Sequence, residues 1–235
     1  MLNSALRTGL LVSGISLAAA APLSVSANSE VDPWEGFNRP VFSFNEGLDT
    51  YAVKPLAQGY RYVTPDIAER GVSNFFDNLG DVRNLLNNLL QFKFEAAGQS
   101  FARLTFNSTF GLFGLIDVAT PMGIERKPED FGQTLGYWGV PSGPYLVLPF
   151  FGPSNPRDGV SIFADAAVDP VRQVGDTSDR NALYGLRLVD TRSRLLQAEQ
   201  IISGDKYSFI RDAYMQRREY QINDQAVDVD YKNDF

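Results

Sequence analysis

The side chains that most often perform covalent or metal chemistry are missing from this sequence. It contains no Cys and no His, which excludes Ser-His-Asp and Cys-His nucleophiles, zinc sites built on His or thiolate, and disulfides. Carboxylates, Lys, Tyr and Ser are left, and no pair of them has a spacing that indicates acid–base catalysis. We therefore expect no catalytic residue, no metal site and no cofactor.

Acidic and Gly-rich stretches give no binding motif either. Glu129-Asp130 and the pair Asp165 and Asp169 lack the ligand spacing of a calcium loop, so we expect solvated surface at both. The sequence GPSNPRDG at 152–159 has no G-x-x-x-x-G-K pattern and is not a phosphate loop. The net charge of −7 argues against nucleic acid as a partner, because such binding depends on neutralising phosphates.

The chain begins with the features of a cleaved secretory signal at residues 1–27. Arg7 precedes a short apolar run at 9–23, and small residues at 25–27 form a cleavage site. The run is too short to form a bilayer-crossing helix of about 20 residues. We expect one mainly α-helical domain at residues 28–220, followed by an acidic, disordered tail at 221–235.

Start signals and apolar periodicity predict the helices of this domain. A helix begins near Asp32, and Pro40 is expected to kink or split it. Residues 54–63 have the character of a connector, and Thr64-Pro65 starts the next helix. Asp81 is expected to cap a third helix, on which an uncharged polar face lies opposite an apolar one: Asn84, Asn87, Asn88 and Gln91.

A Gly/Pro-rich segment at 128–159 divides the second half of the domain. It is expected to hold a loop or a short hairpin, with strands at 135–140 and 144–150 around a turn at 141–143. A short helix is expected from 161 to before Pro170, a long amphipathic helix from 178 to about 203, and another helix after Asp205.

The stretch FARLTFNSTFGLFGLIDVA, residues 101–119, carries no charge between Arg103 and Asp117. As a helix its uncharged part would be about 20 Å long, short of the roughly 30 Å of bilayer hydrocarbon. We expect two short apolar helices bent at Gly111 and Gly114. They either pack in a core or lie in one membrane leaflet, since both environments accept an apolar circumference.

Four blocks of sequence resemble one family, MlaA, also called VacJ, over about residues 32–220. In order they are DPWEGFNRPVFSFNEGLD at 32–49, NFFDNLGDVRNLLNNLLQ at 74–91, RLTFNSTFGLFGLIDVA at 103–119 and DFGQTLGYWGVPSGPYLVLPFFGPSNPRD at 130–158. The resemblance implies a ring-shaped domain of amphipathic and leaflet-embedded helices, seated in the outer membrane beside a trimeric porin. It also implies that mislocalised phospholipid leaves the outer leaflet through an amphipathic channel and passes to a periplasmic MlaC-like carrier. The resemblance implies, in addition, that this transport hydrolyses no bond.

Within this resemblance we single out two sets of residues. Phe44, Asn45, Asn84 and Asn87 are expected to line the channel or bind lipid. The membrane-embedded side chains are expected to be Phe101, Leu104, Phe106, Phe110, Leu112, Phe113, Leu115 and Ile116.

The absence of Cys is a departure from familiar family members, which carry a lipid-modified Cys after the signal. We therefore expect a protein at the periplasmic face of the outer membrane without an acyl anchor. The alternative is a soluble periplasmic lipid-binding or scaffold protein whose apolar run is buried. A phospholipase that uses a carboxylate is a distant third.

Overall fold

The computed structural model describes residues 32–223. The expected signal at 1–27 and residues 224–235 of the expected tail lie outside them. The described elements are α1 (Glu35–Leu48), the π-helical turn η1 (Asp49–Val53), α2 (Lys54–Val63), α3 (Asp66–Leu90), α4 (Phe94–Thr109), η2 (Thr120–Met122), α5 (Phe131–Tyr137), β1 (Leu146–Leu148), β2 (Gly152–Ser154), α6 (Pro156–Ala167), η3 (Pro170–Gln173), α7 (Thr177–Leu195), η4 (Ala198–Ile201) and α8 (Lys206–Ile222).

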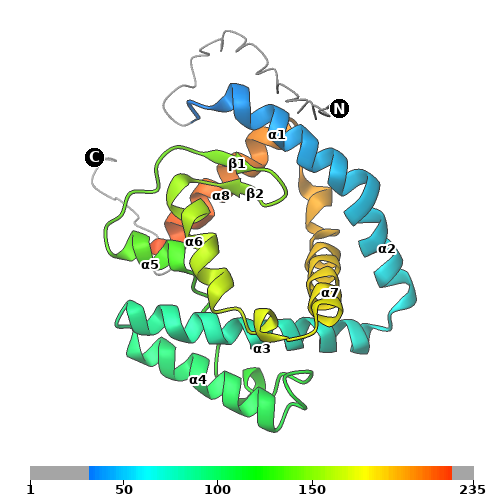
Figure 1. The fold of residues 1–235 in the computed structure, drawn as a ribbon, viewed down its shortest axis with the longest axis vertical. Helices are drawn as coiled ribbons and strands as arrows, with labels where there is room; N and C mark the ends of the chain where they lie inside the picture. Colours follow the sequence, from blue (N-terminus) through cyan, green and yellow to red (C-terminus); the bar gives the residue numbers. More distant parts are fainter. Residues whose placement is uncertain (1–31, 224–235) are drawn as a thin grey trace, which may run out of the picture.

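The helices are arranged as a ring (Figure 1). Along the ring α2 packs on α7, α7 on α3, α3 on α5 and α5 on α8, and α1 packs on β1. Helix α4 runs beside α3 on the outside of the ring, so that the α3–α4 pair forms one of its edges (Figure 1). The expected mainly α-helical, ring-shaped fold is confirmed.

A buried polar group joins the first helix of the ring to its last. The Asn38 side chain donates to Asp32 Oδ1 at 2.8 Å and to the Tyr145 carbonyl at 3.0 Å, and its own oxygen accepts from Val147 N at 2.8 Å. The Tyr207 hydroxyl of α8 donates to the other Asp32 oxygen. One asparagine and one aspartate therefore hold α1, β1 and α8 together.

Two expectations about the N-terminal half are wrong, and one of the two alternatives for Pro40 is excluded. Residues 54–63 form α2, because Pro55 lies in the first turn, where no hydrogen bond is lost. Helix α1 is not split at Pro40; asparagines on both sides of it are tied to the β1–β2 segment. Asp81 does not begin a helix but lies inside α3, which starts after Thr64-Pro65 as expected. Its side chain is occupied by arginine rather than by backbone N–H groups.

The hairpin exists but lies further along the chain than expected. Strand β1 pairs antiparallel with β2, with Val147 opposite Pro153, whereas Leu135 to Tyr137 belong to α5. Helices α6 and α7 also begin earlier than expected, since Asn155 and Asp176 cap them by accepting backbone N–H groups. Helix α8 begins after Asp205 as expected and includes the first two residues assigned to the tail.

Candidate lipid-contact surface

The described part of the chain has a polar interior and an apolar exterior. Residues 32–223 include 22 buried polar or charged residues but only eight buried hydrophobic ones, while 34 large hydrophobic side chains are exposed. A domain surrounded by water has the opposite preference, because burial of apolar surface drives its folding. A surface this rich in exposed apolar side chains is typical of contact with lipid or another apolar partner.

The run 101–116 faces outward. Of the eight side chains expected in the membrane, six are exposed, among them Phe110 at 69% and Phe113 at 80%, while Leu104 and Phe106 are partly buried. The alternative that this run forms a buried core is therefore wrong for the described structure. No described helix is long and apolar enough to cross a bilayer. Contact of the run with one leaflet stays a prediction.

The expected second apolar helix is instead a tight, hydrogen-bonded loop at 110–116. Leu112 and Phe113 have positive φ angles of 51° and 58°, which are rare for large side chains. The strain is held by backbone bonds from Gly114 N to the Asn107 carbonyl at 2.9 Å and from Ile116 N to the Gly111 carbonyl at 2.8 Å. This loop fixes large apolar side chains on the outside of the α3–α4 edge.

The two glycines of the loop are required for its shape. A Cβ at Gly111 would collide with the Ile116 carbonyl and lie 2.5 Å from that of Asn107, and a Cβ at Gly114 would lie 2.6–2.8 Å from the Asn78 side chain. Gly111→Ala is therefore expected to lower the free energy of unfolding by about 1–3 kcal/mol. The matched change Gly59→Ala, in a helix with open space, should raise it by up to about 1 kcal/mol. Denaturant titration of both variants checks this; equal effects would show that the loop is not tightly packed.

Beneath the loop, Arg103 of α4 is the centre of a buried ion network. Its Nε donates to Asp81 Oδ2 at 3.3 Å, its Nη2 to Asp117 Oδ2 at 3.1 Å, and its Nη1 to the Ile124 carbonyl at 2.7 Å. Arg126 pairs with the other Asp81 oxygen at 3.2 Å. Burial raises the pKa of Asp81 despite these two cations, so the network depends on both arginines to keep that carboxylate charged.

Asn107 and Asp117 connect this network to the loop that follows. The Asn107 oxygen accepts from Val118 N and Ala119 N, at 2.9 and 3.0 Å, while its amide donates to Asp117. Burial disfavours the Asp117 carboxylate, but hydrogen bonds from Thr120 and Arg103 outweigh it and lower the pKa of Asp117 to about 2. The apolar loop thus rests on a carboxylate, that of Asp117, which stays ionised at neutral pH.

The expectation that Asn84 and Asn87 line a channel is wrong. Asn84 is 0% exposed; it donates to Asp81 at 2.8 Å and accepts from Glu129 N at 3.0 Å. Asn87 is also buried and accepts from the Thr134 hydroxyl at 2.8 Å. The asparagine face of α3 points into the protein, and leucines on the other face are exposed. Glu129, expected on the solvated surface, is buried in the same network.

Phe44 and Asn45 have different roles. The Asn45 side chain donates to the Leu148 carbonyl at 2.9 Å and accepts from Phe150 N at 2.8 Å, so it anchors the β1–β2 turn to α1. Phe44 is half exposed and stacks edge-on against the exposed Phe150, with ring centres 5.4 Å apart. Lipid contact of Phe44 stays a prediction, whereas Asn45 positions the β1–β2 turn.

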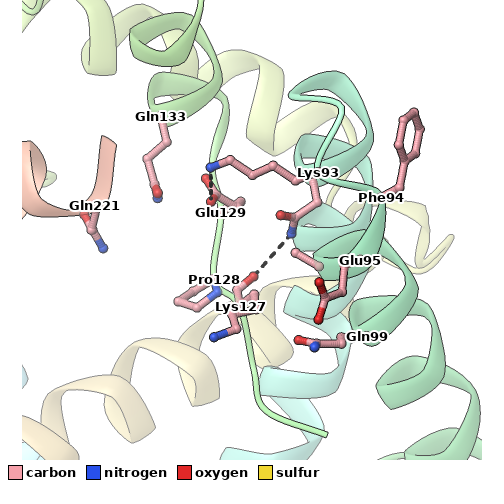
Figure 2. A pocket seen from close by; sticks show the side chains of 11 residues that line it. Lys93, Phe94, Glu95, Gln99, Lys127, Pro128, Glu129, Gln133 and Gln221 are labelled. Carbon is pink, nitrogen blue, oxygen red and sulfur yellow. Dashed lines mark hydrogen bonds and ion pairs between the residues drawn. The ribbon is translucent and has the colours of Figure 1, made fainter. Parts of the chain in front are cut away.

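A polar cavity of about 490 Å³ lies where α4 begins. Figure 2 shows Gln133 and Gln221 facing it from α5 and α8, and Lys93 paired with Glu129 in its lining. The Lys93 Nζ lies 3.2 Å from Glu129 Oε1. None of the residues expected to line the channel or to lie in the membrane lines this cavity, although Asn88 and Glu129 do. No described group of acidic residues is arranged to hold a metal ion.

A second cavity, of about 390 Å³, lies between α3, α6 and α7 and is lined by arginines and aspartates. Sequence reasoning missed it, because its charges are far apart in the chain. Asp165, expected on the solvated surface, lines it and accepts from Phe131 N at 3.1 Å. Burial raises the pKa of Asp165 to about 6 from an ordinary value of 3.8, with Arg83 opposing the shift.

This shift predicts a pH-dependent effect of Asp165→Asn. The folded protein binds the proton more tightly than the unfolded chain, so the carboxylate costs no stability below about pH 4 and its full cost above about pH 6. We expect Asp165→Asn to raise the free energy of unfolding by about 1–2 kcal/mol at pH 7.5 and not at pH 4. Unfolding curves at both pH values check this, with exposed Glu219→Gln as the control. A gain that is the same at both pH values would contradict it.

Comparisons with known proteins agree with the resemblance in the sequence. The sequence profile of the family described as MlaA lipoprotein matches residues 30–221. The intermembrane phospholipid transport system lipoproteins MlaA of Shigella flexneri and Escherichia coli are each 35% identical over 225 residues, 93% of this chain and 89% of theirs. An uncharacterized protein of Rickettsia bellii is 34% identical over 195 residues, 81% of this chain and 76% of its own. A solved structure reported as "Structural basis for maintenance of bacterial outer membrane lipid asymmetry" matches with a TM-score of 0.72 at 34% identity, covering 82% of this chain and 99% of that one.

Proposed function

This chain belongs to the MlaA family, and from that premise we propose that it takes part in intermembrane phospholipid transport. In this proposal it removes mislocalised phospholipid from the outer leaflet of the outer membrane and passes it to a periplasmic carrier. The result is maintenance of outer-membrane lipid asymmetry. The relatives named as MlaA and the structure concerned with lipid asymmetry support this function.

The single observation that carries the proposal is the inverted burial of residues 32–223. Exposed side chains such as Phe113, Leu112 and Phe110 form a surface suited to acyl chains, and buried ion pairs hold that surface rigid from within. We propose that the loop 110–116 lies in one leaflet without crossing the membrane. The backbone of the loop is bonded internally, as a lipid environment requires.

The proposed action is physical rather than chemical. Moving a phospholipid through water costs about 0.8 kcal/mol for each exposed methylene, which makes an unshielded path very slow. We propose that the ring provides an amphipathic channel, with a polar path for the head group and apolar walls for the tails. No bond is made or broken, so the protein acts as a non-enzymatic conduit.

We extend the proposal to location and partners. In this proposal the protein lies at the periplasmic face of the outer membrane, beside a trimeric porin. It delivers lipid to a soluble MlaC-like carrier. The support for this part is family membership, together with an apolar surface that can hold the ring in lipid. Detergent-dependent extraction from the outer membrane and cross-linking to a porin are the expected results, and recovery in the soluble periplasm without a porin would contradict them.

Transfer of labelled phospholipid tests the function itself. The purified protein is reconstituted in vesicles containing fluorescent phospholipid, and a soluble MlaC-like carrier is added as acceptor. We expect intact lipid to reach the carrier faster than from protein-free vesicles. Equal rates would contradict the proposal. Release of lysophospholipid or fatty acid would instead identify an enzyme.

A further inference from the structure

Two cavities of opposite character border the contact between α3 and α7. The charged cavity of about 390 Å³ includes Phe76 of α3 and Arg187 of α7. An apolar cavity of about 270 Å³ includes the preceding residue of each helix, Phe75 and Leu186. The rings of Phe75 and Phe76 contact each other, with centres 5.3 Å apart. Both cavities therefore border the same stretch of the α3–α7 contact, with this ring pair between them.

The charged cavity holds one arginine whose guanidinium makes no hydrogen bond or ion pair within the described residues. Arg126 pairs with Asp77 at 2.8 Å, Arg187 with Asp169 at 2.7 Å, and Arg194 with Asp77 at 3.3 Å. Arg83 is different: within residues 32–223 its guanidinium makes no ion pair or hydrogen bond, and its Nε is buried. Its charge acts only at longer range, on the Asp165 carboxylate of the same cavity.

One group of this cavity, Arg83, is suited to bind an anion. The lining comprises four arginines and three aspartates, and two further aspartates just outside it, Asp81 and Asp190, pair with Arg126 and Arg194. Arg83 is therefore the lining arginine that has no aspartate in ion-pair contact. A buried guanidinium N–H without an acceptor is costly, and its planar fork matches two oxygens of a phosphate.

The apolar cavity is built from three separate segments. Val72 and Phe75 come from α3, Leu186 from α7, and the rest of its lining, Leu112, Phe113 and Leu115, from the strained loop. All six lining side chains are apolar, so the cavity offers nothing to a polar ligand. Because the same loop carries the exposed apolar surface, the cavity lies at the edge of the region proposed to contact the leaflet.

We propose that the two cavities together bind one phospholipid molecule, with its phosphate on Arg83 and the end of an acyl chain against Leu186 and Val72. This inference rests on the proposed function and adds to it a defined lipid site with a phosphate-recognising residue. An amphiphile with one anionic end matches both cavities. Inorganic phosphate matches only the charged cavity.

Photo-cross-linking in proteoliposomes tests the site. The probes are a phospholipid with a photoreactive acyl chain and a diacylglycerol with the same chain but no phosphate. Labelling of Leu186 and Val72 measures lipid bound in the apolar cavity. Labelling of Phe110 and Ile116, which do not line it, reports bulk lipid in the same sample. We expect the phospholipid to label all four residues. The diacylglycerol should label only Phe110 and Ile116.

Arg83→Gln is expected to reduce labelling of Leu186 about tenfold, the effect of losing a charged hydrogen bond, without changing that of Phe110. Arg217→Gln, at an exposed α8 arginine without an ion pair in the described structure, is the control and should change neither. The inference is overturned by equal labelling of Leu186 in both variants, by equal labelling with diacylglycerol, or by displacement of the lipid with millimolar inorganic phosphate. Carrier transfer measured on the same proteoliposomes reports the proposed function separately, so the two can fail independently.

Discussion

Replacing Phe110 and Phe113 with aspartate is expected to release the protein from lipid vesicles. The two side chains are 69% and 80% exposed, and each apolar side chain of this size gains about 1.5–3 kcal/mol on leaving water. Their removal should therefore lower the membrane partition coefficient by more than about 100-fold, even before the cost of placing carboxylates in hydrocarbon is counted. Vesicle flotation measures the change directly.

Two controls separate this effect from unfolding and from charge. Because neither phenylalanine is buried, the free energy of unfolding in detergent should change by less than about 1 kcal/mol. The conservative pair Phe110→Leu and Phe113→Leu should float like the unaltered protein, and so should Gln216→Asp, which adds a carboxylate at an exposed polar position of α8. If the double aspartate variant still floats fully, the loop 110–116 is not the membrane contact.

Replacing Arg103 with methionine is expected to produce the largest loss of folding stability. Arg103 is 4% exposed and bonds to Asp81, Asp117 and the carbonyl of Ile124. Without it, two carboxylates lose their buried cation, and breaking such a pair costs about 3–5 kcal/mol. Denaturant unfolding in detergent should show this decrease, while Arg217→Met on the exposed face of α8 should change stability by less than about 0.5 kcal/mol.

A double-mutant cycle with Asp81→Leu tests whether the cost comes from the unpaired charge. The double variant should be less destabilised than the sum of the single variants, because it removes both charges of one pair. Strict additivity would show that Arg103 acts through packing alone. The network also positions the loop, so Arg103→Met should weaken vesicle binding although Arg103 touches no lipid in this account.

Local signals in the sequence predicted several elements well. Thr64-Pro65 precedes α3 because the residue before a proline is driven out of helical geometry, and Thr64 is extended here. Asp205 precedes α8 as expected. The apolar run stands out by its lack of charge between Arg103 and Asp117. The structure decides between its two interpretations, since six of its eight large apolar side chains are exposed.

Other features depended on contacts that the sequence does not reveal. The two faces of α3 follow from periodicity, but which face is buried depends on the surroundings, and here the asparagine face is inside. Asp81 has the sequence character of a helix cap, yet two distant arginines use its carboxylate instead. The charged cavity likewise combines residues from three helices, among them Arg83 and Arg187, and no local pattern links them.

The most direct test of the central claim, that the loop 110–116 lies in a lipid leaflet, is depth-dependent fluorescence quenching. The sequence has no Cys, so one fluorophore can be attached to a single variant, Phe113→Cys, with Arg217→Cys as the control. In vesicles whose lipids carry a quencher on the acyl chain, we predict strong quenching at position 113 and little at position 217. Equal, weak quenching at both positions would show that the apolar loop does not enter the membrane and would contradict the account.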